Sequence, residues 1–244
     1  PAPAAIERIT GGDLAKLAQG YLDTLSRLSH DAQRVTDKMP HNFMALGYID
    51  LLFPDCRIVH CVRDPRDTCL SIWFRQMTGN HPYTADLDAL ADYYRQYSVL
   101  MAHWKSVIRV PVLDVGYESL VADIERGARE LVAFCGLDWS DECLRFYENA
   151  RVVTTPTYND VREPVHGRSV GRWRHYERHL AALAGFAEPS SVFMLGTNTR
   201  LGEADGAAAA LREEPCAVAV VDRREMDSFT KALDGLPVTR HGTI

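Results

Sequence analysis

Two residues that could bind an anion, Arg63 and Ser71, stand eight positions apart in the sequence. Residues 56–62 form an apolar run that predicts a buried strand, and Pro65 is typical of the first turn of a helix. Arg63 would therefore lie at the carboxyl end of a strand, where open α/β sheets bind ligands, and beside a helix N-terminus that offers free N–H groups. An arginine fork and a hydroxyl that converge there are typical of a phosphate site. A solvated helix start explains the same spacing, and this alternative stays open.

The charge of the chain favours a small anionic ligand. The net charge is −6, which argues against nonspecific binding to nucleic acid. Arginines nevertheless gather in two places along the sequence, at Arg63, Arg66 and Arg75 and at Arg162, Arg168, Arg172 and Arg174. An acidic protein with two basic clusters suits a small anion better than a polyanion.

Stretches with helical spacing of apolar residues alternate with short apolar runs. Helices are predicted at residues 12–29, 42–53, 65–77, 87–108, 118–135, 141–149 and 173–185, and strands at 33–37, 56–62 and 110–115. This alternation indicates an α/β fold with a parallel sheet covered by helices. Residues 151–172 show little apolar periodicity and are predicted to form a long loop, and such loops are often functional.

The composition changes after residues 187–191, which are predicted to form a linker. Beyond them the pattern predicts strands at 192–195 and 217–221 and helices at 202–213 and 226–233. A βαβα unit of this size is marginal on its own. We therefore expect two parts, residues 1–187 and an unassigned segment at residues 188–244, which packs against the main sheet or continues into something absent.

Several short motifs occur together in one order along the chain. They are Asp37-Lys38-Met39-Pro40, the run from Leu52 to Pro65, Met101-Ala102-His103-Trp104, Tyr117-Glu118-Ser119-Leu120 and Ser169-Val170-Gly171-Arg172-Trp173. Their joint pattern, over about residues 10 to 186, resembles the sulfotransferase superfamily. It is most similar to bacterial sulfotransferases attached to TPR repeats and more distantly similar to tyrosylprotein sulfotransferases. The resemblance implies a three-layer parallel sheet flanked by helices, like that of P-loop NTPases.

The resemblance also implies a co-substrate, 3′-phosphoadenosine 5′-phosphosulfate (PAPS), which leaves as PAP, and no metal. The residues that match nucleotide-binding positions of the family are Arg63 and Ser71 for the 3′-phosphate, Arg168 and Ser169 in a late loop over the same phosphate, Arg172 close by, and Tyr117 near the nucleotide.

Two further residues, Lys38 and His41, are candidates for the chemistry at the transferred sulfuryl group, and of these Lys38 matches a family position. Lys38 matches a lysine whose fixed positive charge stabilises the negative charge that develops as the sulfur–oxygen bond breaks. His41 would face the acceptor and act as a base. Their alternative readings are an exposed lysine at a strand end and a histidine at a helix start.

One motif of the family, a loop of the form G-x-P-R-S-G-T-T, has no counterpart between Pro1 and Gln33. Such a loop cradles the 5′-phosphosulfate with backbone N–H groups. Residues 192–202 have the order strand, Gly/Thr loop, helix, but they lack the Arg-Ser-Gly-Thr-Thr core. We therefore expect a fragment that is incomplete at the N-terminus, with a missing segment or TPR repeats upstream.

Two functions follow from these observations. The first is transfer of a sulfuryl group from PAPS to a hydroxyl or amine of a small molecule or peptide, with residues 78–86 and 151–166 as candidates for acceptor contacts. The second is a degenerate, inactive module that binds PAP, another adenine nucleotide or a protein. A nucleotide kinase relative is disfavoured because no Gly-Lys-Ser/Thr loop is present.

The remaining sequence features predict a cytoplasmic protein without nucleic-acid or membrane partners. No run of about 18 apolar residues occurs, and the N-terminus does not resemble a signal peptide. None of the six cysteines forms a CxxC pair, which favours reduced structural thiols.

Overall fold

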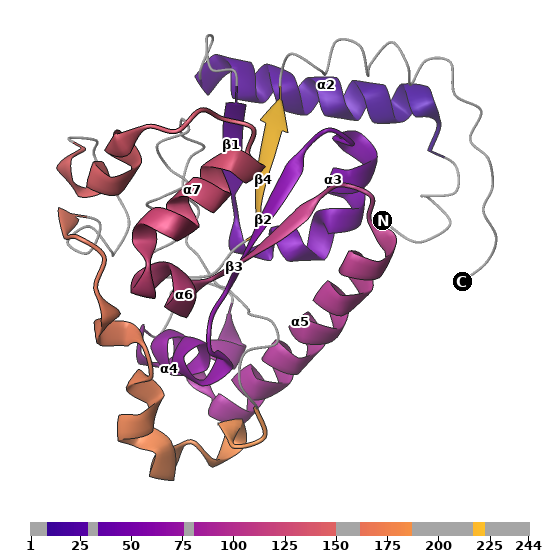
Figure 1. The fold of residues 1–244 in the computed structure, drawn as a ribbon. Helices are drawn as coiled ribbons and strands as arrows, with labels where there is room; N and C mark the ends of the chain where they lie inside the picture. The colour runs from indigo at the N-terminus through magenta and orange to yellow at the C-terminus, as the bar shows by residue number, and fades with distance from the viewer. Residues whose placement is uncertain (1–8, 29–33, 76–80, 150–161, 187–216, 223–244) are drawn as a thin grey trace.

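The computed structural model describes residues 9–28, 34–75, 81–149, 162–186 and 217–222. Its helices are α2 (Gly11–Leu28), α3 (Leu46–Leu52), α4 (Pro65–Arg75), α5 (Leu87–Val107), α6 (Tyr117–Ala122) and α7 (Ile124–Phe134). The 3-10 helices are η1 (Pro40–Ala45), η2 (Pro82–Ala85), η3 (Asp141–Glu148), η5 (Gly167–Ser169), η6 (Arg172–His179) and η7 (Ala181–Leu183). The strands are β1 (Arg34–Lys38), β2 (Arg57–Val62), β3 (Val112–Gly116) and β4 (Ala217–Asp222), and Figure 1 shows them as a small sheet among the helices.

The sheet has the strand order β1-β4-β2-β3. Strands β2 and β3 are parallel, whereas β4 is antiparallel to both of its neighbours. Strands β1 and β2 therefore also run in the same direction, and the carboxyl ends of β1, β2 and β3 lie at one edge of the sheet. The expectation of a wholly parallel sheet is wrong for β4, because its antiparallel pairing makes the sheet mixed.

Apolar side chains pack against both faces of β2. Ile58 belongs to a large cluster that includes Leu46 of α3 and Met101 of α5. Its neighbour Val59 belongs to a smaller cluster with Leu131 of α7. Successive side chains of a strand point to opposite faces, so a strand covered on both faces has apolar residues at consecutive positions, as at Ile58 and Val59. This confirms the prediction of a buried strand at residues 56–62.

Helix α5 shows why the helical prediction succeeded there. Its buried residues Leu90, Tyr94, Tyr97 and Met101 recur at intervals of three and four, which places them on one stripe. The side chain of Asp86 accepts a hydrogen bond from the Ala89 N–H at 2.7 Å, which caps the N-terminus.

Some predicted helices differ from those observed. The helix predicted at 118–135 is two helices, α6 and α7, separated at Asp123, whose backbone is non-helical (φ −148°) and whose side chain accepts a hydrogen bond from Arg126 N–H. The helix predicted at 42–53 begins as the 3-10 helix η1. The predictions at 141–149 and 173–185 are also met by 3-10 helices. Local capping and short turns thus interrupt the apolar spacing on which the predictions rested.

The strand predicted at 217–221 is confirmed as β4. The predicted elements at 192–195, 202–213 and 226–233 lie outside the described residues. Within the described part of the chain, no helix is both long enough and apolar enough to cross a membrane. None of the five cysteines of that part is joined in a disulfide.

Candidate nucleotide site

Three of the predicted site residues come directly from the common edge of the sheet. Lys38 is the last residue of β1, Arg63 follows β2, and Tyr117 follows β3. This is the edge at which α/β sheets bind ligands. Strand β4 lies between β1 and β2, whereas β2 and β3 are neighbours. Along this edge, Lys38 is therefore farther from Arg63 than Arg63 is from Tyr117.

A cavity of about 850 Å³ opens beside this edge. All six residues predicted to bind the nucleotide line it, namely Arg63, Ser71, Tyr117, Arg168, Ser169 and Arg172. They come from three parts of the chain: α4 and the residue pair before it, the start of α6, and the segment at 167–173. The structure therefore brings together residues that are about a hundred positions apart in the sequence. Their roles toward a nucleotide stay predictions.

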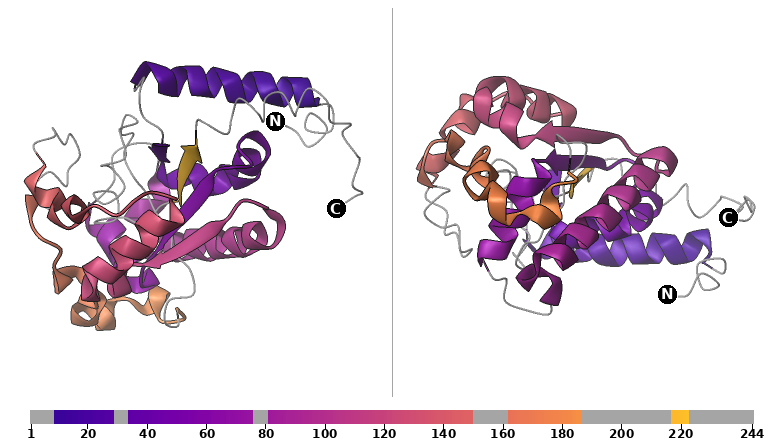
Figure 2. Two further views of the ribbon diagram at one scale, coloured as in Figure 1. Left: turned by 45° about the horizontal axis from the view of Figure 1, so that its top comes forward. Right: turned by 90° about the horizontal axis from the view of Figure 1, so that it is seen from below.

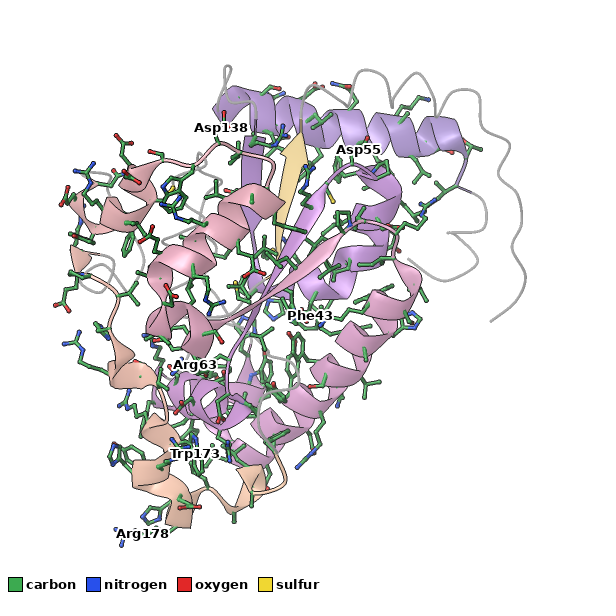
Figure 3. All side chains as sticks on the ribbon, in the orientation of Figure 1. Phe43, Asp55, Arg63, Asp138, Trp173 and Arg178 are labelled. Carbon is green, nitrogen blue, oxygen red and sulfur yellow. The ribbon has the colours of Figure 1, made fainter. Side chains whose placement is uncertain are left out.

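Arg63 is the most buried cation of this cavity, with 5% of its surface exposed. Its Nη2 donates a hydrogen bond to the Ser169 carbonyl oxygen at 2.7 Å, and its guanidinium lies 4.8 Å from the centroid of the Tyr117 ring. Its Nε is buried and has no hydrogen-bond partner among the described residues. Because buried polar groups are nearly always bonded, this donor fits an anionic oxygen supplied by a ligand. Figure 3 shows Arg63 between the end of β2 and the segment that carries Trp173.

The other cations of the site are more exposed. The Arg168 side chain is 65% exposed and donates to Glu163 Oε2 at 2.7 Å. The guanidinium of Arg172 lies 5.2 Å from the centroid of the Phe74 ring. These two arginines can therefore turn toward an anion at small cost, whereas Arg63 is fixed by its burial.

The part of the cavity wall formed by α6 and α7 is largely apolar. It runs from Tyr117 along α6 and α7, past Ile124 and Leu131, to Asp138 beyond the end of α7. Phe146 of η3 lies on the same wall. Burial raises the pKa of Tyr117, against the opposing effect of the nearby Arg63 charge, so this ring stays a neutral phenol. A cationic end joined to an apolar wall suits a ligand with anionic groups on an aromatic base.

Asp67 is a residue of this site that the sequence reasoning missed. It is 1% exposed, and its carboxylate accepts hydrogen bonds from the backbone N–H groups of Gly171 at 2.6 Å and Trp173 at 2.7 Å. Burial raises the pKa of Asp67, although both hydrogen bonds and the Arg63 charge act in the opposite direction. The spacing of Asp67 and Ser71, four residues apart in α4, is the signal that could have found it, since residues four apart share a helix face.

The two residues predicted near the sulfuryl group do not line the cavity. Lys38 is partly buried at the end of β1. His41 stacks on His81, with ring centroids 5.3 Å apart and planes 10° apart. Burial lowers the pKa of His41, and the neighbouring His81 lowers it further, so a neutral imidazole that can accept a proton is favoured near pH 7. His81 belongs to the predicted acceptor segment at 78–86, of which residues 78–80 lie outside the described part of the chain.

The other acceptor candidate, residues 151–166, is described only from residue 162 onward. No group of three or more His, Cys, Asp or Glu side chains among the described residues is placed to hold a metal ion.

The chain matches a model described as the sulfotransferase family over residues 4–141. It is 32% identical over 181 residues to an uncharacterized protein of Aquifex aeolicus, covering 73% of this chain and 24% of that protein. It is 26% identical over 128 residues to protein-tyrosine sulfotransferase 2 of Gallus gallus, covering 52% and 34%. It is 28% identical over 102 residues to cytosolic sulfotransferase 14 of Arabidopsis thaliana, covering 36% and 29%. The matched part of each relative is thus between 24% and 34% of its length.

Proposed function

Because the chain belongs to the sulfotransferase family, we propose that it transfers a sulfuryl group from PAPS to a hydroxyl or amine acceptor. The single observation that carries this proposal is the buried Arg63, which has an unpartnered Nε and lines a cavity with Ser71 and Ser169. A fixed guanidinium of this kind supports binding of the 3′-phosphate, which distinguishes PAPS from other adenine nucleotides.

The six residues that line the cavity would contact different parts of the nucleotide. Arg63 and Ser71 hold the 3′-phosphate from the β2–α4 side, and Arg168, Ser169 and Arg172 hold it from the 167–173 side. Tyr117 contacts the nucleoside, next to the apolar wall of α6 and α7.

In the transfer, the acceptor oxygen or nitrogen forms a bond to sulfur while the bond between sulfur and the bridging phosphate oxygen breaks. The electron pair of that bond leaves with PAP, and the acceptor proton passes to a base. We assign Lys38 to the negative charge that develops on the bridging and sulfuryl oxygens, and His41 to the proton. The partial burial of His41 and its stacking on His81 support its assignment as the base, because both favour a neutral imidazole ring.

One observation favours a second candidate, a module that binds PAP without transferring a sulfuryl group. Strand β4 runs antiparallel between β1 and β2, so its amino end lies at the ligand edge. A phosphate-cradling loop follows the carboxyl end of a strand. Among the described residues, therefore, β4 does not supply such a loop at this edge.

Titration calorimetry with PAP tests the nucleotide site. Arg63→Ala should weaken PAP binding by about 2 kcal/mol or more, because a buried charge-assisted contact is lost. A matched control is Arg109→Ala, since Arg109 precedes β3 at the opposite edge of the sheet and its side chain is 73% exposed. Equal PAP affinity in the wild-type chain and Arg63→Ala would contradict the assignment.

A second assay separates transfer from binding. Release of PAP from PAPS is followed in the presence of phenol and of a tyrosine-containing peptide. If the chain transfers, Lys38→Ala should abolish PAP release while PAP binding stays close to that of the wild type. Tight PAP binding without any PAP release would favour the second candidate.

A further inference from the structure

The segment at residues 167–173 is attached to the rest of the site through alternate residues. The Ser169 carbonyl oxygen accepts a hydrogen bond from Arg63 Nη2 at 2.7 Å. The N–H groups of Gly171 and Trp173 donate to Asp67, at 2.6 and 2.7 Å, one to each carboxylate oxygen. The 3-10 helix η6, which lies in the orange stretch of the chain in Figure 2, is in contact with α4.

Gly171 is required at the centre of this attachment. Its φ is +68°, a left-handed conformation that side chains disfavour. A Cβ atom there would lie 2.3 Å from Arg174 Nη1, the end of an exposed side chain that can move away, so the φ angle is what favours glycine. The turn at Gly171 lets two nearby N–H groups point at one carboxylate.

The ring of Trp173 adds a further contact, because the guanidinium of Arg66 lies 3.8 Å from its centroid. Arg66 is in turn paired with Asp64 at 2.6 Å. The first turn of α4 therefore holds the 167–173 segment through a carboxylate and through a stacked cation.

The residues that Asp67 holds are neighbours of those predicted to bind the anion. Arg168 and Ser169 lie just before Gly171, and Arg172 lies between the two bonded N–H groups. A carboxylate at 1% exposure is costly to bury unless its hydrogen bonds compensate. A negative charge beside a phosphate site would also oppose the ligand, so Asp67 must contribute through the segment that it holds.

We infer that Asp67 is a positioning residue: it holds the 167–173 segment so that Arg168, Ser169 and Arg172 line the cavity together with Arg63 and Ser71. It thereby gives the cavity its preference for a nucleotide with a 3′-phosphate. This inference rests on the proposed function, because that function supplies the ligand.

The test compares Asp67→Asn with Asp50→Asn in the full chain. Asp50 is a matched control, since it is also buried and its Oδ1 accepts hydrogen bonds from two backbone N–H groups, those of Arg109 at 2.7 Å and Val110 at 3.0 Å. Those groups precede β3, at the edge opposite the cavity. Affinities for PAP and AMP are measured by calorimetry, and exchange of backbone amides in peptides from 167–173 is measured by mass spectrometry.

Asp67→Asn should lower PAP affinity about tenfold and AMP affinity less than about twofold, because AMP lacks the phosphate that the segment contacts. Amide exchange in residues 167–173 should become faster. Asp50→Asn should leave both the preference for PAP over AMP and this exchange unchanged. Gly171→Ala disturbs one attachment point and keeps the carboxylate. It should change the preference for PAP over AMP and the amide exchange in the same direction as Asp67→Asn does. It replaces Asp67→Asn in the test if Asp67→Asn does not fold.

An equal loss of PAP and AMP affinity, or a retained preference for PAP, would overturn the positioning role. So would unchanged exchange in residues 167–173. A wild-type chain that does not bind PAP contradicts the proposed function instead, and the exchange measurement then decides by itself whether Asp67 holds the segment.

Discussion

His41 and His81 form a pair of imidazoles near the end of β1. Burial disfavours a proton on the His41 ring, and the stacked His81 acts in the same direction. The pKa of His41 is therefore below its ordinary value of 6.5. The unfolded chain binds this proton more readily than the folded chain, so the stability contributed by His41 is present above pH 6.5 and falls as the pH drops through its folded pKa.

Replacing His81 separates the two causes. In His81→Gln the pKa of His41 should rise but stay below 6.5, because burial, the larger cause, remains. The measurement is an NMR titration of the His41 ring protons in the wild type and the variant. His103→Gln is the control, since His103 packs on Trp104 in α5. A pKa of His41 that is unchanged in His81→Gln would show that the pair is not coupled.

At the residue scale, the sequence pointed to three arginines that line the cavity, Arg63, Arg168 and Arg172, and missed the carboxylate of Asp67. Arg63 and Ser71 stand out because a strand, a proline and a helix fix their positions relative to each other. Asp67 does not stand out, because an aspartate in the first turn of a helix is explained by the helix dipole alone. Its partners, the N–H groups of Gly171 and Trp173, lie 104 and 106 residues away.

At the scale of elements, replacing glycine by alanine is expected to have opposite effects on fold stability at two positions. Gly171→Ala should destabilise the fold by about 1–2 kcal/mol, because φ is +68° there and a side chain is strained. Gly20→Ala should stabilise it by about 0.5–1 kcal/mol, because Gly20 lies inside α2 and a Cβ atom would meet nothing within 4 Å.

Urea unfolding followed by circular dichroism measures both changes. The two variants alter the chain by the same methyl group, so each is the control for the other. A Gly171→Ala variant that is at least as stable as the wild type would contradict this account of the backbone at Gly171, and a loss of stability in Gly20→Ala would contradict the account of α2.

The bounds of helices were predicted well where a long apolar stripe determines the helix. They were predicted less well where local hydrogen bonds determine them. α2 and α5 agree with their predicted ranges within about one residue at each end. The break at Asp123 arises because the side chain of this residue caps the N-terminus of α7. The spacing of apolar residues carries no information about such a cap. The 3-10 helices η3 and η6 are short enough that periodicity cannot distinguish them from α-helix.

At the scale of the whole molecule, the pattern predicted β4 as a strand but not its place. An apolar run shows that a segment is buried and extended, whereas its neighbours and direction depend on contacts far away in the sequence. β4 pairs with β1 over residues 34–38 and with β2 over residues 57–60, so it joins two strands that are not neighbours in the sheet.

A proline in β4 tests whether that strand holds the sheet together. Ala219 pairs with Asp37 of β1 and with Ile58 of β2, so it lies at the centre of the sheet. Ala219→Pro removes a backbone N–H from the ladder and places a ring where central strands do not accept one, which should lower the free energy of unfolding by about 3 kcal/mol. Ala219→Ser keeps the N–H and separates the backbone effect from the change of side chain, so it should lie much closer to the wild type. Urea unfolding of the three chains gives the comparison. If the proline variant unfolds at the same urea concentration as the wild type, the β1 and β2 parts of the fold are stable without β4, and the central place of this strand in the sheet is refuted.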